Sequence, residues 1–442
     1  MLVATKFSYA CAWVLMKNTN TSFERTAKTM LIKVPPAAAA ATPGKRLVSL
    51  DQFRGYTVAG MFLVNYFGGY AVCPQVLRHT HDYCSYADTI MPHFLFAVGF
   101  ALRLTFGRRV EAQGTTAAYA RMVRRLLGLI LVSLVIYTVS PRAENWEQLK
   151  QLGLWGAISE PLKRDWFQTL MHIAVTSLWV LPVLRSSAST RILWMVGSGF
   201  AHVGLSYWFA YTWVNTSPNG IDGGPLGFLT WCIPTIVGTL ACDIFIRPRE
   251  QLQLFSPTLI KVALASLAMM AFAWAISCGT RLYDVPESRV EALRAEKLAP
   301  DPVWPAAERF EAKQGQGWES WLAEPPFVKP PDAAHRKWNY WMMSQRAGTL
   351  AYPTFAAGFS LLVYLLFFIV CDLFGFQLAF FRTFGTNALL GYVLHGMVAS
   401  AVKPFFPEDS PAWYALTGLF IFFLVTWIIV RHFEKQNIFL RV

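Results

Sequence analysis

The chain has 442 residues, of which 55% are hydrophobic and only 15% are charged. This balance is too apolar for an ordinary soluble domain, and several apolar runs reach the roughly 20 residues that a spanning helix needs. Because the runs are continuous rather than alternating, the sequence predicts an all-α polytopic membrane bundle and not a β-barrel. The net charge of +13 matches the Lys and Arg excess of cytoplasmic loops, so no nucleic-acid partner is expected.

In chain order, residues 1–44 are expected to be a disordered N-terminal tail, because "VPPAAAAATPGKR" is typical of a linker. A single membrane domain, 45–442, follows it. About ten spanning segments are predicted there, at 53–73, 87–107, 124–140, 166–184, 191–214, 226–246, 257–278, 350–372, 380–402 and 411–431. One connection is long: residues 279–349 form a polar insertion whose many Trp side chains would either stack on sugar rings or anchor the loop at the membrane interface.

Basic residues set the predicted topology. The loop between the second and third spans carries Arg108, Arg109, Arg121, Arg124 and Arg125, whereas the loop at 215–225 has no Lys or Arg. With ten spans, the rule that positive loops stay inside places both termini in the cytoplasm. The loop before the second span and the insertion then face outward. One outer loop goes against the rule, because Arg142, Lys150, Lys163 and Arg164 lie between the third and fourth spans.

The stretch "RHTHDYCSYADTIMP" places polar residues against an apolar span. Imidazole titrates near neutral pH, so His79 or His81 is a candidate general base or acyl-accepting nucleophile. The imidazole, carboxylate and thiol groups of this stretch also suggest a metal site. Their spacing matches no closed zinc pattern, so no metal is expected. Asp88 is expected to cap the second span and also to orient a histidine. Cys73 and Cys84 flank this loop and could form a disulfide if it lies outside the cytoplasm.

Polar residues inside spans are rare and are candidates for function. Asn65 lies midway along the first span, and Asn387 and His395 lie near one face of a later one. For each, an interhelical hydrogen bond is as good an explanation as a role in a central site. Arginine binds phosphate well through paired N–H donors. The candidates for a phosphate-binding site on the cytoplasmic side are therefore Arg54, Arg103, Arg124 and Arg125.

The segments "RLVSLDQFRGYTVAGMFLVNYFGGY" and "LRHTHDYCSYADTIMPHFLFAVGFALRL" resemble the opening of the transmembrane heparan-α-glucosaminide N-acetyltransferase family. That family shows S-x-D-x-F-R-G, then M-x-x-V-N, a histidine, and A-D-x-x-x-P-x-F-x-F-x-x-G. "GGPLGFLTWCIPTIVGTLACD", "FFRTFGTNALLGYVLHGMV" and the final "NIFLRV" are similar to later family segments. The resemblance covers residues 46–442, and the insertion is the least alike.

The resemblance implies transfer of acetyl from cytoplasmic acetyl-CoA, a co-substrate, to an amino sugar or glycan on the outer side of the bilayer. It points to His79 as the active histidine, with Asn65 and Asp88 beside it. The pantetheine arm of CoA would run from the phosphate-binding arginines towards Asn65 and His79. The chain departs from the family at "THDYCSYA", where the family has Trp-Asn-Gly, and at Leu170-Met171-His172, where it has Leu-Gln-Arg.

A second hypothesis is a transporter or flippase of a polar metabolite or sugar, which internal repeats would favour. No convincing repeat relates the two halves of the sequence. A structural subunit without chemistry would leave Asn65, Asp88 and Arg103 unexplained. The acyltransferase hypothesis is therefore preferred, with a bacterial-type plasma (inner) membrane as its expected location. A homodimer is compatible with the sequence but not indicated by it.

Overall fold

The computed structural model describes residues 47–440, and the predicted tail at 1–44 lies outside them. Throughout the described range the chain is helical and forms no β-strand, which confirms the predicted all-α class. Its internal contacts divide the chain into two compact units. In the described range the first unit is 47–73 with 377–440, and the second is 74–376.

Within residues 47–440, six helices are long and apolar enough to cross a membrane, which makes the chain an integral membrane protein. They are Ala87–Gln113, Gly224–Phe245, Pro257–Tyr283, Ala351–Leu373, Ala388–Phe405 and Ala412–Lys435. Trp146–Asp165 and Thr169–Val183, bent by 91°, add a seventh if they act as one span. The predicted segments at 53–73, 124–140 and 191–214 lie largely on the helices Val48–Phe67, Thr115–Ile136 and Ala188–Leu205, which are not among these six. The total of ten spans stays a prediction.

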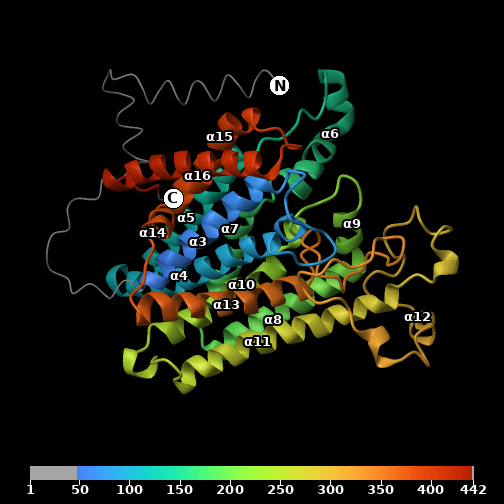
Figure 1. The fold of residues 1–442 in the computed structure, drawn as a ribbon, viewed down its shortest axis with the longest axis horizontal. Coiled ribbons are helices and arrows are strands. Elements are labelled where there is room, and N and C mark those ends of the chain that lie inside the picture. Colours follow the sequence, from blue (N-terminus) through green and yellow to red (C-terminus); the bar gives the residue numbers. More distant parts are fainter. Residues whose placement is uncertain (1–46, 441–442) are drawn as a thin grey trace. The chain divides into compact units, whose positions relative to one another are not determined.

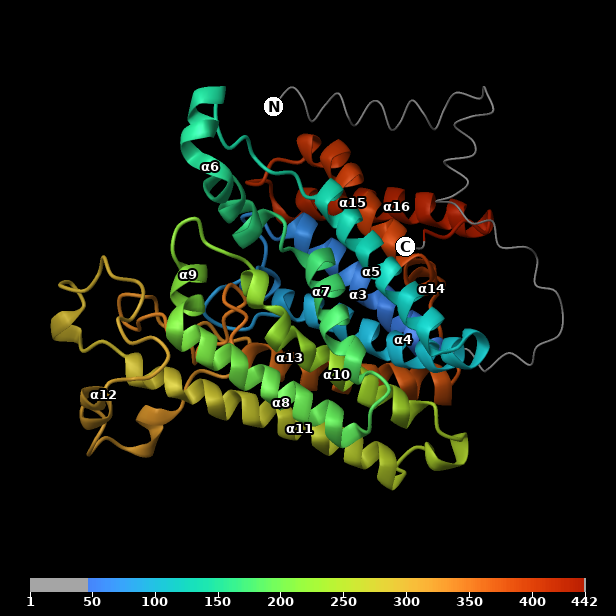
Figure 2. The same cartoon turned by 180° about the vertical axis from the view of Figure 1, so that it is seen from behind.

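The second unit is built around α10 (Phe228–Phe245), which is buried along most of its length. It packs against α4 (Ile90–Gln113), α7 (Thr169–Val180), α8 (Ala188–Leu205) and α13 (Ala351–Phe367), as Figure 1 shows. Around this core, α11 (Pro257–Ser277) packs along α13, and α5 (Thr115–Ile136) lies beside α7 (Figure 2). The other α-helices described in this unit are α6 (Trp146–Glu160), α9 (Tyr211–Asn215) and α12 (Ala307–Glu311).

Glycines set the close approach of α4 and α10. A Cβ atom added to Gly99 would lie 1.9 Å from the carbonyl oxygen of Thr235, and one added to Gly238 would lie 2.1 Å from that of Phe96. Each helix therefore presents a glycine to the backbone of the other, as small residues do at tight helix interfaces in membranes.

Replacing Gly99 by alanine is expected to destabilise the second unit, because the methyl group has no room against a backbone oxygen. Overpacking of this kind costs about 1–3 kcal/mol or more. The melting temperature in detergent should fall by several degrees. Gly107→Ala is the matched control, since it lies on the same helix and nothing would meet its Cβ within 4 Å. Equal melting temperatures for both variants would contradict the tight contact.

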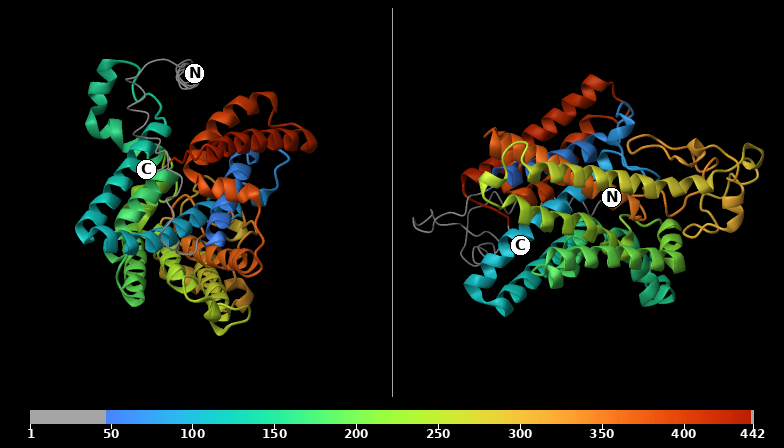
Figure 3. Two further views of the ribbon diagram at one scale, coloured as in Figure 1. Left: turned by 90° about the vertical axis from the view of Figure 1, so that its left-hand side faces the viewer. Right: turned by 90° about the horizontal axis from the view of Figure 1, so that it is seen from below.

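The insertion at 279–349 is a folded cap and not an open loop, and Figure 3 shows it beyond the end of α11. Its centre is Arg336, only 1% exposed, whose Nε donates to Asp284 at 2.6 Å and whose guanidinium also pairs with Glu324. The side chains of Trp304 and Trp318 are 73% and 71% exposed. Both predicted uses of these aromatics, sugar stacking and interface anchoring, remain open.

The first unit joins the two ends of the described chain. It contains α3 (Val48–Phe67), α14 (Ala379–Thr386), α15 (Ala388–Val402) and α16 (Ala412–Lys435). The helices α3 and α14 touch through glycines, since a Cβ on Gly55 would lie 1.8 Å from the Phe381 carbonyl oxygen. The side-chain amide of Gln52 then pairs with both backbone groups of Leu378, at 3.0 and 3.1 Å.

Candidate active site

The loop between α3 and α4 folds around the buried carboxylate of Asp88, which is 1% exposed. The backbone N–H of Ser85 donates to its Oδ2 at 3.0 Å. The hydroxyls of Thr80 and Ser85 lie 2.9 Å from the same oxygen, although each also has a backbone carbonyl within reach. Tyr352 on α13 donates to the backbone carbonyl of Asp88. A buried carboxylate needs several donors, and this loop supplies them.

Asp88 does not cap α4, so that part of the prediction is wrong. A 3₁₀ turn, Ala87–Thr89, precedes the helix, and the residues at the two N-cap positions, Tyr86 and Thr89, make no side-chain cap hydrogen bond. The carboxylate instead accepts hydrogen bonds from upstream residues, because the loop wraps back over it. Pro92 lies in the first turn of α4, where its missing N–H leaves no helical hydrogen bond unmade.

The other oxygen of Asp88 holds His79, as predicted for an orienting carboxylate. Nδ1 of His79 lies 2.9 Å from Oδ1 of Asp88, and the imidazole side chain is 47% exposed. Since a carboxylate only accepts, Nδ1 carries the proton and Nε2 keeps its lone pair in the neutral ring. A carboxylate that fixes the tautomer of a histidine in this way leaves its second nitrogen ready to accept a proton.

The two histidines of the loop differ in basicity. Burial lowers the pKa of His79, but the hydrogen bond and charge of Asp88, with the charge of Asp222, outweigh it and raise the pKa above its usual value. Burial and the positive charge of Arg346 lower the pKa of His81 to about 4. Because a base is most effective when its pKa lies near the working pH, His79 is better suited than His81.

Two distant loops meet beside these histidines. Nε2 of Gln345 donates to Oδ1 of Asp222 at 2.7 Å, and the backbone N–H of Gly223 donates to the carbonyl of Arg346 at 2.9 Å. Asp222 is 5% exposed, and burial raises its pKa to about 7 although Gln345 and His79 oppose the shift. The sequence alone did not indicate Asp222, Gln345 or Arg346 as residues of a site. The turn signal "IDGG" marked the first loop, but nothing in "SQRAG" indicated a site.

Arg346 is a buried cation, 9% exposed, whose guanidinium lies over the Trp338 ring at 5.0 Å. Its Nη1 has no hydrogen-bond partner among the described residues, and neither has Oε1 of Gln345. Burial and the positive charge of Arg164 lower the pKa of Arg346. The insertion thus places an unused donor and an unused acceptor on adjacent residues near the histidine loop.

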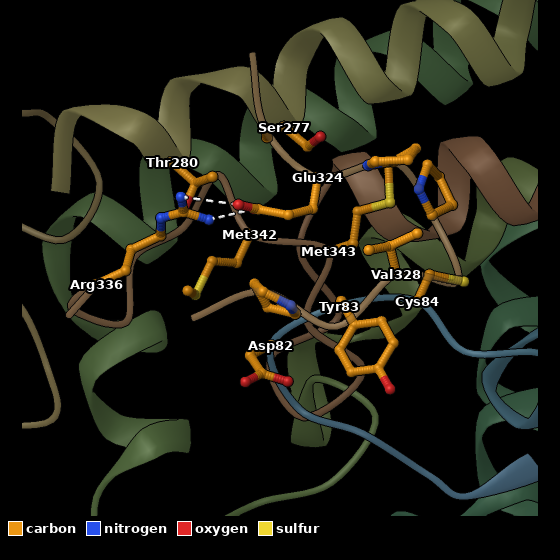
Figure 4. A pocket seen from close by; sticks show the side chains of 14 residues that line it. Asp82, Tyr83, Cys84, Ser277, Thr280, Glu324, Val328, Arg336, Met342 and Met343 are labelled. Carbon is orange, nitrogen blue, oxygen red and sulfur yellow. Dashed lines mark hydrogen bonds and ion pairs between the residues drawn. The ribbon is translucent and has the colours of Figure 1, made fainter. Parts of the chain in front are cut away.

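A small pocket lies on the other side of the same loop (Figure 4). It is lined by Asp82, Tyr83 and Cys84, and across from them by residues of α11 and the insertion, including the Glu324–Arg336 pair. Its volume of about 20 Å³ suits roughly one water molecule. The pocket is therefore too small for a thioester or a sugar. Cys84 is a buried free thiol, so the predicted disulfide with Cys73 is absent.

The remaining candidates from the in-span analysis lie in the first unit. Nδ2 of Asn65 lies 3.4 Å from Nε2 of His395, whose Nδ1 donates to the carbonyl of Tyr392. Asn387 instead bonds to the backbone of the C-terminal segment, donating to Ile438 at 3.0 Å and accepting from Leu440 at 3.1 Å. The structure thus pairs Asn65 with His395 and gives Asn387 a separate structural contact. The expected grouping of Asn65 with His79 remains a prediction.

The four arginines of the predicted phosphate-binding site differ in their contacts. Arg103 donates to Asp243 through Nε and to the Leu184 carbonyl through Nη1, both at 2.7 Å. Asp243 also binds the buried Arg191, so one carboxylate serves two guanidinium groups. Arg124 and Arg125 are exposed on α5, and Arg54 is half-buried on α3. Their role in binding phosphate stays a prediction.

Comparison with known proteins adds no identification. No protein-family model matches the chain. No curated protein matches it either. The chemistry of the site therefore has to be argued from its own geometry.

Proposed function

We propose that the chain is a transmembrane acetyltransferase. It would take acetyl from acetyl-CoA on the cytoplasmic side and deliver it to the amine of an amino sugar or glycan on the outer side. The proposal includes ten spans with cytoplasmic termini in a bacterial-type plasma membrane. Arg54, Arg103, Arg124 and Arg125 would hold the CoA phosphates, and His79 would act on the acceptor.

The observation that carries the proposal is the pairing of His79 with Asp88 at the start of a membrane helix. A half-exposed imidazole with a fixed tautomer and a raised pKa is suited to general base catalysis. The quoted sequence resemblance supports acetyl as the group transferred.

In the proposed reaction, the lone pair of the acceptor nitrogen attacks the thioester carbonyl carbon. Nε2 of His79 takes a proton from that nitrogen as the tetrahedral intermediate forms. The carbon–sulfur bond then breaks, and the imidazolium returns the proton to the departing CoA sulfur. Asp88 stabilises the imidazolium between these two steps, as the carboxylate of a catalytic triad does.

The direct test is transfer of radiolabelled acetyl from acetyl-CoA to a panel of amino sugars by the purified chain in detergent. We expect labelled N-acetyl product from at least one amine and none from the matching sugar that carries a hydroxyl in place of the amine. Acetyl-CoA should also raise the melting temperature. Absence of both product and stabilisation with every CoA ester would refute the proposal. Stabilisation by a sugar alone would favour the transporter hypothesis.

A further inference from the structure

Asp222 is a buried carboxyl group that the proposed reaction has not yet used. Its backbone has φ +52°, a left-handed conformation that a residue other than glycine rarely adopts. The conformation is enforced by its neighbours. The indole N–H of Trp231 donates to the Asp222 carbonyl oxygen at 2.7 Å. A Cβ atom added to Gly227 would lie only 2.1 Å from the same oxygen, so the carbonyl can approach because residue 227 is glycine. Strained residues of this kind cluster at functional sites.

A chain of contacts joins Asp222 to the histidine loop. The ring of Trp231, which donates to the Asp222 carbonyl, lies 5.4 Å from the ring of Tyr352, and Tyr352 donates to the Asp88 carbonyl. Gln345 holds Oδ1 of Asp222. The charges of Asp222 and His79 also shift the pKa of each other. Charged and titratable side chains of four neighbouring segments surround this loop. They are His79, His81 and Asp88 of the histidine loop, Lys163 and Arg164 of residues 161–165, His172 of α7, and Arg346 of the insertion.

Acetylation that starts from an ammonium ion removes two protons from the nitrogen. At neutral pH an aliphatic amino sugar is largely an ammonium ion, which has no lone pair and cannot attack. One proton must leave before attack and a second during it. His79 can take only one of them, because its other nitrogen is committed to Asp88.

We propose that Asp222 is the second proton acceptor, which binds the acceptor ammonium and removes its first proton. This inference rests on the proposed function. In the first step the ammonium and the Asp222 carboxylate become a neutral amine and a carboxylic acid. The amine then attacks the thioester, and His79 takes the second proton and passes it to the CoA sulfur. Asp222 finally releases its proton to water. Overall, an ammonium ion and acetyl-CoA give an N-acetyl amine, CoA and one proton.

Asp222→Asn tests the step, because the amide oxygen of the variant can still accept from Gln345 while the proton acceptor is lost. With an aliphatic amino sugar, kcat/KM below neutral pH should fall by roughly 100-fold, the low end for a lost general base. The deficit should shrink towards parity above the pKa of the acceptor amine, where the free base enters directly. Asp82→Asn, a neighbouring half-buried carboxylate, should show no such pH-dependent deficit.

A deficit that stays constant with pH, in a variant still stabilised by CoA, would overturn the inference. If the variant does not fold, the wild-type protein decides. Its kcat/KM should rise with pH through two ionisations that stay at the same pH for aliphatic amino sugars of different amine pKa, because both belong to the enzyme. An ionisation that follows the pKa of the acceptor amine would show that only the free base reacts, and would overturn the inference. Absence of transfer by the wild-type protein to any amine would instead refute the proposed function.

Discussion

Replacing His79 by alanine is expected to reduce acetyl transfer to an amino sugar by roughly 10²–10⁴-fold, the usual contribution of a positioned base. The methyl group cannot accept the proton that the acceptor nitrogen loses, and no other group in the loop replaces it. Stabilisation by CoA should be unchanged, because the residues proposed to hold its phosphates lie elsewhere in the chain. The measurement is the initial rate of radiolabel transfer, with the CoA-dependent melting temperature taken on the same samples.

The chain offers a matched control for this experiment. His335 also bonds to a carboxylate, with Nδ1 2.7 Å from Asp332, and its ring is 45% exposed. Because His335 lies on the surface of the insertion, His335→Ala should transfer acetyl at the wild-type rate. His81→Ala should lose far less than His79→Ala, since the pKa of His81 is lowered to about 4. Full activity of His79→Ala with loss in His81→Ala would move the catalytic role to His81.

Helices were predictable from the sequence because the apolar runs are long enough to span a bilayer. How they pack was not, because it depends on pairs of residues far apart in the chain. Gly99 and Gly238 are each ordinary glycines in an apolar run, and only the structure shows each against the backbone of the other helix. The insertion was least predictable. Its fold depends on Arg336 reaching both Asp284 and Glu324, a pattern that no local periodicity encodes.

The pair His79 and Asp88 of the candidate site was predictable because the two residues lie close together in the sequence. His79 and Asp88 are nine residues apart, close enough for one loop to join them, and polar groups at the start of a span stand out. The other half was hidden in tertiary contacts. Asp222 and Gln345 are 123 residues apart, and each looks like an ordinary loop residue until the two loops meet.

Lys163 and Arg164, which went against the charge rule, have local partners in the structure. Nζ of Lys163 donates to the carbonyl of Thr216 at 2.7 Å, and Nη1 of Arg164 donates to that of Asn219 at 3.2 Å. Both therefore bind the backbone of the loop that ends in Asp222. Both charges thus have a structural role in this loop, and the outward side expected for it stays a prediction.

Replacing Asp88 by asparagine is expected to lower acetyl transfer by roughly 10³–10⁴-fold, the scale seen when a carboxylate that orients a histidine becomes an amide. The amide oxygen can keep the Ser85 N–H bond, which preserves the loop. If the amide nitrogen then faces Nδ1 of His79, the proton moves to Nε2, and the ring has no lone pair for the acceptor amine. If the amide flips instead, the hydrogen bonds to Ser85 and Thr80 suffer, and the loop loses stability.

The pH dependence separates a catalytic role of Asp88 from a structural one. The Asp88 charge raises the pKa of His79, so its loss should lower that pKa. Since neutral imidazole is the active form, the residual activity of Asp88→Asn should begin its rise at lower pH than that of the wild-type protein. A variant that is merely unstable would lose activity without moving the profile. Asp82→Asn controls for the loss of a nearby charge, and an unshifted profile in Asp88→Asn would contradict the assignment of His79 as the base.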